Sequence, residues 1–241
     1  MREKLHTIPV NDAFDHDSEC PVCYMIKELE TKVIDFTMGP SYMEDDVRGE
    51  TSRLGFCDKH IELLYKNQNR LGLSLILKSH LDRVIKDIEK LSASNTRTQS
   101  PSLFKKQKSE SGVVSYVEEL DRSCYICAMI ERTFERYIAT IFYLYRHEDE
   151  FRKKFKACKG FCIRHYGLLH KEAPKHLSGS QLQAFINELN TLYLDNMKRV
   201  RDDLDWFIDK FDYRYANEPW KNSKDALPRT INKTNSIIRD K

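Results

Sequence analysis

The sequence has no hydrophobic run long enough to cross a membrane and no marked excess of charge of either sign. Its 241 residues include 40 basic and 37 acidic side chains, a net charge of +3, so it lacks the surplus of a strongly basic nucleic-acid binder. The longest nearly unbroken apolar run, Tyr137 to Tyr145, is far shorter than the roughly 20 residues of a membrane helix. Residues 1–6 lack the apolar core of a secretory signal. We therefore expect a cytoplasmic protein without a membrane partner.

The common catalytic and nucleotide-binding motifs are also missing. The sequence contains no Gly-x-Gly-x-x-Gly, no Walker loop, no Gly-x-Ser-x-Gly and no His-Glu-x-x-His. A ferritin-like di-iron bundle would need paired Glu-x-x-His motifs, and only Glu3-Lys4-Leu5-His6 matches. Because no nucleophile, base and orienting group can be named, the motifs favour a protein that is not an enzyme but leave the question open.

Cysteines, in contrast, are plentiful and regularly spaced. There are seven, and an odd number without an export signal argues against a disulfide framework. Six of them form two similar sets. Each set has a Cys-x-x-Cys and, after 33 or 34 intervening residues (24–56 and 128–161), a Cys-x-x-His. Gly-Phe comes directly before each Cys-x-x-His. The first set is Cys20, Cys23, Cys57 and His60, and the second is Cys124, Cys127, Cys162 and His165.

The repetition extends beyond these residues. Glu44-Asp45-Asp46-Val47-Arg48 recurs as Glu148-Asp149-Glu150-Phe151-Arg152, with the 104-residue offset that separates Cys20 from Cys124. We interpret the pattern as an internal duplication of a unit of about 100 residues, which gives two lobes rather than a solenoid.

Three thiolates and one imidazole are a ligand set typical of a closed tetrahedral zinc site. Each set thus predicts one Cys3His metal site, and the chain two zinc ions. Iron–sulfur clusters also use Cys-x-x-Cys pairs, so a cluster is an alternative. Cys158 lies outside the repeat and is expected to be a packing thiol.

Apolar residues recur with helical spacing almost throughout, and no window alternates as a strand would. The fold predicted is all-α, an internally duplicated two-lobe helical bundle with a Cys3His site in each lobe. The expected parts are a first lobe over 1–91, a flexible polar linker over 92–112, a second lobe over 113–215 and a loosely ordered polar tail over 216–241.

Basic residues are concentrated in the linker and the tail, which weakens the case for a basic binding face on the helical body. Nucleic acid is therefore not an expected partner. The acidic clusters Glu44-Asp45-Asp46 and Glu148-Asp149-Glu150 have two interpretations. They could orient a ligating histidine or bind a second cation, or they could be first-turn acids that a helix dipole favours, with the following Arg as an ion-pair partner.

Several segments also resemble a known family. Thr7-Ile8-Pro9-Val10-Asn11, Gly39-Pro40-Ser41-Tyr42-Met43 and Asn69-Arg70-Leu71-Gly72-Leu73, together with the cysteine motifs, resemble an uncharacterised domain-of-unknown-function family of anaerobic Gram-positive bacteria. The resemblance implies a cytoplasmic bacterial protein whose Cys and His positions match metal ligands, and it implies no activity.

These observations leave competing functions. The first is a structural metalloprotein, an interaction or regulatory module with protein partners or self-association. The second is an iron–sulfur redox or electron-transfer protein. The third is an enzyme that uses the acidic clusters, with a second metal ion.

Overall fold

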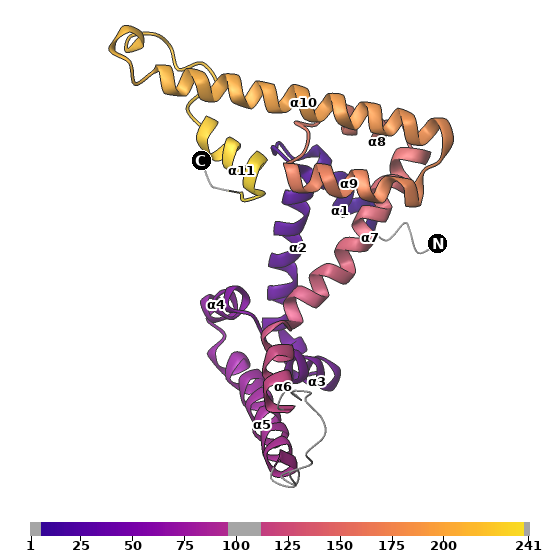
Figure 1. Cartoon of the computed structure of the whole chain (residues 1–241), viewed down its shortest axis with the longest axis vertical. Helices are drawn as coiled ribbons and strands as arrows, with labels where there is room; N and C mark the ends of the chain where they lie inside the picture. Colours follow the sequence, from indigo (N-terminus) through magenta and orange to yellow (C-terminus); the bar gives the residue numbers. More distant parts are fainter. Residues whose placement is uncertain (1–5, 96–111, 239–241) are drawn as a thin grey trace, which may run out of the picture. The chain divides into compact units, whose positions relative to one another are not determined.

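The structure is a computed structural model that describes residues 6–95 and 112–238. These residues form helices joined by short connections, with no strand among them, as predicted (Figure 1). No helix in these ranges is both long enough and apolar enough to span a bilayer. Of the expected linker over 92–112, residues 96–111 lie outside the described part of the chain.

The helices fall into two compact units. Unit 1 consists of Met1–Glu28 and Thr133–Lys241, and unit 2 consists of Leu29–Arg132. This grouping differs from the lobes expected over 1–91 and 113–215, because two helices each begin in one unit and end in the other. They are α2 (Pro21–Met38) and α7 (Tyr125–His147).

Unit 1 is built around the longest helix, α10 (Gly179–Asp209), against which α9 (Ile163–His176) and α11 (Ala226–Asn235) pack (Figure 1). The other elements of this unit are α1 (Thr7–Asp15), α8 (Asp149–Ala157) and the 3-10 helix η3 (Tyr213–Tyr215). Its core is aromatic: Phe155 lies 5.4 Å from Phe185 and 5.5 Å from Phe161, measured between ring centroids. Burying rings of this size is the main source of stability available to the unit.

Unit 2 contains the longer part of α2 and the helices that follow it. These are η2 (Pro40–Met43), α3 (Asp45–Leu54), α4 (Asp58–Lys66), α5 (Arg70–Asn95) and α6 (Gly112–Asp121), with the first residues of α7. Helix α5 packs against α3, α4 and α6. The core of this unit is aliphatic and includes Leu64, Leu73 and Ile76.

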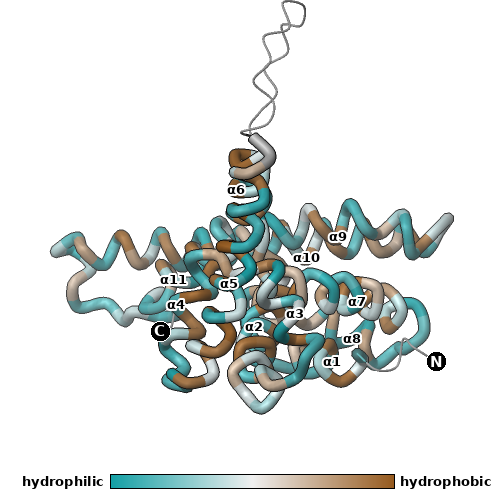
Figure 2. Tube along the Cα trace, turned by 90° about the horizontal axis from the view of Figure 1, so that it is seen from below, coloured by the Kyte–Doolittle hydropathy of each residue, from teal (hydrophilic) through white to brown (hydrophobic). Residues whose placement is uncertain are grey.

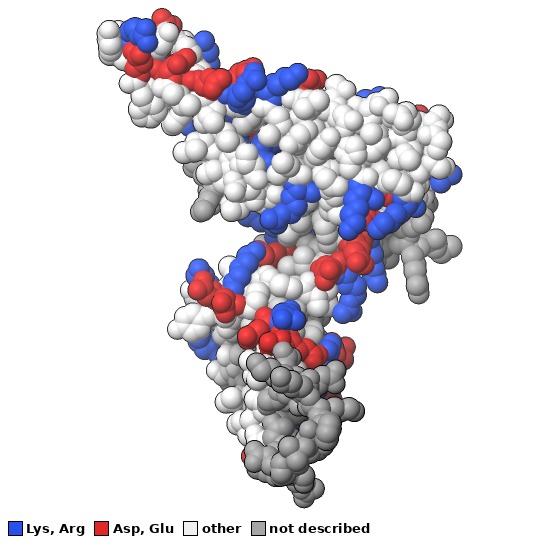
Figure 3. All heavy atoms as spheres, viewed as in Figure 1, with Lys and Arg blue, Asp and Glu red and all other residues white. Residues whose placement is uncertain are grey.

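The apolar residues that recur with helical spacing mostly face the core. Figure 2 shows the resulting alternation of hydrophilic and hydrophobic residues along α10, as an amphipathic helix requires. Helix α5 is an exception, because its regularly spaced Leu77 and Leu81 are exposed while Leu73 is buried. Acidic and basic side chains intermix at the end of α10 in Figure 3, so no single-sign patch forms on the face shown there.

The polar tail expected over 216–241 is more ordered than predicted. Residues 226–235 form α11, and its residues Ala226, Asn232 and Lys233 are buried in unit 1. Their burial depends on tertiary partners, which the polar composition of the segment does not indicate.

Candidate metal centres

Each of the four cysteine motifs lies at the start of a helix. In each motif the first cysteine immediately precedes the helix, and the second Cys or His lies three residues later, in the first turn. The four helices are α2, α4, α7 and α9. The carbonyls of Cys57 and Cys162 accept the first helical hydrogen bonds, from Ile61 and Tyr166, at 2.9 Å each. At this spacing both side chains point to the same side of the helix. The partial positive charge of a helix N-terminus also favours thiolates.

A glycine shapes the turn before each Cys-x-x-His motif. Gly55 and Gly160 adopt φ angles of +58° and +76°, in the left-handed region that favours glycine. The Gly55 carbonyl accepts a hydrogen bond of 3.0 Å from the Tyr125 N–H, which joins this turn to the start of α7. The turn thus places one ligand pair beside another.

The first group of ligands, the unit 1 centre, consists of Cys20, Cys23, Cys162 and His165, all buried. The Nδ1 atom of His165 lies 3.1 Å from the Cys162 Sγ, 3.3 Å from the Cys23 Sγ and 3.4 Å from the Cys20 Sγ. The Cys23 and Cys162 sulfurs are 3.6 Å apart.

The second group, the unit 2 centre, consists of Cys57, His60, Cys124 and Cys127. The Nδ1 atom of His60 lies 3.2 Å from the Cys57 Sγ and 3.3 Å from each of the other two sulfurs. The Cys57 and Cys127 sulfurs are 3.9 Å apart. This centre is less enclosed, since Cys127 is exposed and Cys57 half-buried.

All eight predicted residues therefore gather into two Cys3His groups, but the predicted pairing is wrong. The structure pairs each Cys-x-x-Cys with the Cys-x-x-His of the other half of the sequence. The helices explain the exchange. Helix α2 begins right after Cys20, and its 18 residues are about 27 Å long at about 1.5 Å per residue. The Cys-x-x-His that follows in sequence is consequently built into unit 2, and α7 returns the chain to unit 1.

The crowded sulfurs have strongly altered acidities. Burial alone would raise the pKa of the Cys124 thiol, but hydrogen bonds from His60 and from backbone N–H groups lower it to about 6. Burial and the neighbouring Cys124 charge raise the pKa of Cys127 to about 12. In the unit 1 centre, hydrogen bonds from Cys20, Cys23 and His165 lower the pKa of Cys162, whereas burial raises that of Cys20. In each group the negative charge of one thiolate thus opposes ionisation of the other thiols. A bound cation would neutralise this charge repulsion.

A residue that the sequence did not single out supports the unit 2 centre. Glu30 of α2 places its Oε1 atom 3.1 Å from the Nε2 atom of His60, on the opposite side of the imidazole from the sulfurs. A carboxylate in this position fixes the ring orientation and tautomer of a metal-ligating histidine. The sequence suggests the acidic clusters at 44–46 and 148–150 as residues that could orient a histidine. No motif in the sequence marks Glu30 for this role.

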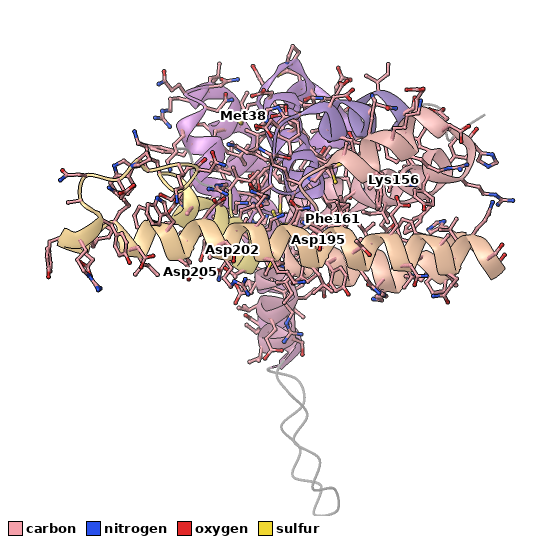
Figure 4. The ribbon with its side chains drawn as sticks, turned by 90° about the horizontal axis from the view of Figure 1, so that it is seen from above. Met38, Lys156, Phe161, Asp195, Asp202 and Asp205 are labelled. Atoms are coloured by element: carbon pink, nitrogen blue, oxygen red, sulfur yellow. The ribbon has the colours of Figure 1, made fainter. Side chains whose placement is uncertain are left out.

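The unit 1 centre has different supports. The Ser236 hydroxyl lies 3.0 Å from the Cys162 sulfur. The buried Lys233 ammonium donates to the carbonyls of Glu19 and Lys159, which lie just before the two ligand-bearing segments. Phe161, labelled in Figure 4, is fully buried in the aromatic core next to Cys162. Tertiary contacts alone bring Ser236 and Lys233 here, so no sequence motif marks them.

The acidic clusters are exposed residues at helix starts. Asp45 and Asp149 are the first residues of α3 and α8, as the dipole interpretation predicts. Arg152 forms an ion pair of 3.4 Å with Asp149, whereas Arg48 instead donates to the Ser79 hydroxyl at 3.3 Å. Neither cluster belongs to the two Cys3His groups.

Cys158 also stays apart from both groups. It is half-buried at the end of α8, and burial raises the pKa of its thiol to about 11. This fits the packing role predicted for it.

The fold and its centres define an all-helical protein with two Cys3His groups that are able to hold metal ions. The chain belongs to DUF6062, a family of unknown function whose profile matches residues 1–241. Neither a curated protein nor a solved structure matches it.

Proposed function

We propose that each Cys3His group binds one zinc ion and that the two ions hold the fold together. The observation that carries this proposal is that each group joins two helix starts far apart in sequence. His165 and Cys20 are 145 positions apart, and Cys57 and Cys127 are 70 apart. Such a link restricts the unfolded chain and adds the binding free energy of the metal to the stability of the fold.

The spacing of the donor atoms supports a single tetrahedral ion. Zinc–sulfur distances of about 2.3 Å and zinc–nitrogen distances of about 2.0 Å require donor atoms roughly 3.5–3.8 Å apart. The sulfur–sulfur distances of 3.6 and 3.9 Å agree, and the sulfur–nitrogen distances of 3.1–3.4 Å are slightly shorter. An iron–sulfur cluster would need its ligands farther apart, because several irons and sulfides would lie between them.

The biological role that we propose is a scaffold for a protein partner in a reducing, cytoplasmic setting, where the seven thiols stay reduced. Helix α5 supports the scaffold part, because Leu77, Leu81 and Ile85 lie four residues apart and are 37–58% exposed. At this spacing they share one helix face, which offers an apolar surface to another helix. Four ligands per ion also leave no open position for a metal-bound water, which favours a structural over a hydrolytic centre.

Metal analysis of matched cysteine variants tests the proposal. We expect about two zinc ions per chain, no visible colour, and about one ion in Cys57→Ser and in Cys162→Ser, since each variant disrupts a different centre. Cys158→Ser is the matched control, because it removes a cysteine outside both groups and should retain both ions.

Other results would contradict the proposal in distinct ways. Iron with an equal amount of sulfide and visible absorption after anaerobic purification would identify a redox protein. Loss of both ions in a single variant that remains folded would show that the centres are not independent.

A further inference from the structure

A cavity of about 310 Å³ lies in unit 1 beside the start of α2. This volume is at the lower end of the range for small-molecule sites. Its walls come from the segment before α2, from the first turn of α2 and from α11, and include Ser18, Glu19, Tyr24, Pro228, Asn232 and Ile238. Cys20 of the unit 1 centre also lines this cavity, but zinc binding there does not account for the cavity.

Three buried oxygens around this cavity lack a hydrogen-bond partner among the described residues: Ser18 Oγ, Glu19 Oε1 and Asn232 Oδ1. The only other such atom, Glu188 Oε1, lines a neighbouring cavity of about 1150 Å³, which also contacts Lys156 and Asp195 (Figure 4). Buried polar atoms without partners are rare in proteins and each costs about 1–3 kcal/mol. Three around one cavity therefore indicate a missing partner.

The surrounding bonds fix the direction of two of these oxygens. The side chain of Glu19 is 8% exposed, and its Oε2 atom accepts from Arg199 at 2.6 Å and lies 3.3 Å from the Lys233 ammonium. Asn232 is 6% exposed and donates from Nδ2 to the Ile237 carbonyl at 3.4 Å. Glu19 Oε1 and Asn232 Oδ1 thus remain as acceptors, and only a hydrogen-bond donor can satisfy them.

The rest of the wall favours a cation with an apolar body. Three basic residues, Lys27, Lys159 and Arg229, share the wall with four acids, and Lys159 is paired with Asp17 and Arg229 with Asp203 at 2.7 Å. The ring of Tyr24 stacks on His16 with centroids 3.9 Å apart, which provides a rigid flat wall. We propose that this cavity binds a small molecule with a primary ammonium or amidinium head, which donates to Glu19 and Asn232, and an apolar body.

Calorimetric titration of the full-length, metal-loaded protein with matched probes tests this site. We expect saturable binding of benzylamine and benzamidine and an accompanying rise in melting temperature. Benzyl alcohol and benzoate, which have the same ring without the cationic head, should bind at least about tenfold more weakly, because they lose the charge-assisted hydrogen bonds.

Glu19→Gln keeps the side-chain shape and should weaken benzamidine binding by about tenfold or more. Glu19 also pairs with Arg199, so Glu19→Gln could disturb folding, and Asn232→Leu is therefore a second variant of the cavity. The control is Glu172→Gln in α9, which lies outside the cavity. Zinc content is measured in each protein, so that loss of a metal centre is distinguished from loss of this site. The proposal fails if the cations do not bind the folded wild type, if the alcohol binds equally well, or if the folded cavity variants bind like Glu172→Gln.

Discussion

If the two groups bind metal as proposed, single residues around them should determine the affinity of each centre, and Glu30 is the clearest case. Glu30→Gln removes the charge that faces His60 Nε2 while it keeps the side-chain size. We expect metal affinity at the unit 2 centre to fall about 10- to 100-fold, as for other partners of ligating histidines. Competition with a chromogenic chelator measures this change.

The matched control for Glu30 is Glu50→Gln in the same unit, where the partner is the exposed Arg53. Equal metal affinity in Glu30→Gln and Glu50→Gln would show that Glu30 does not position His60.

Lys233 is the corresponding residue beside the unit 1 centre, and its role is structural. Its ammonium is fully buried and donates to two backbone carbonyls. Lys233→Met would leave those carbonyls without a donor and remove one of the two cations beside Glu19, so we expect the free energy of unfolding to fall by about 2–4 kcal/mol. Urea titration measures the loss, and Lys175→Met, which removes an exposed ion pair with Glu172, should change stability by about 0.5 kcal/mol or less.

The eight Cys and His residues that gather into the two groups were predictable at the residue scale because each pair is local in sequence. A Cys and a Cys or His three positions apart meet through helix geometry alone. Glu30, Lys233 and Ser236 reach the centres only through tertiary packing, so no spacing rule identifies them.

At the scale of elements, the glycine before each Cys-x-x-His motif is a conformational requirement. Gly55→Ala would force alanine into a left-handed conformation and place its Cβ 2.9 Å from the His80 ring. Gly160→Ala would place it 3.1 Å from the Leu192 carbonyl oxygen. We expect each substitution to destabilise the protein by roughly 1–3 kcal/mol, measured by urea titration.

Two other glycines serve as matched controls, because they lie inside helices α3 and α9 with open space around them. A Cβ added at Gly49 or Gly167 meets no atom within 4 Å. Alanine there should stabilise the protein by about 0.5–1 kcal/mol through its higher helix propensity. If all four substitutions had the same effect, the turn would not be the reason for the glycines.

Helices themselves were predictable from apolar spacing. The order of α11 was not, because a ten-residue polar helix acquires stability only from packing against α9 and α10. The exposed stripe on α5 shows the converse: apolar periodicity predicts a helix but not which neighbour covers it.

For the whole chain, this pairing places the loop between the members of the unit 2 group inside the longer loop between the members of the unit 1 group. Residues 57–127 lie within the segment that the unit 1 centre closes. The internal duplication is still a prediction from the sequence repeat, and it does not specify this exchange. The spacing within each motif is the same whether a Cys-x-x-Cys pairs with the Cys-x-x-His of its own half of the sequence or with that of the other half. The course of the helices therefore determines which two motifs pair.

The two centres should therefore lose metal at different rates. The unit 1 loop is about twice as long, but doubling a loop changes its closure free energy by only about 0.6 kcal/mol. Access should matter more: all four unit 1 ligands are buried, whereas Cys127 in unit 2 is exposed. We expect a chelator to remove the ions in two phases, the unit 2 ion first. Cys57→Ser should abolish the fast phase and Cys162→Ser the slow one, and the reverse assignment would show that burial does not control release.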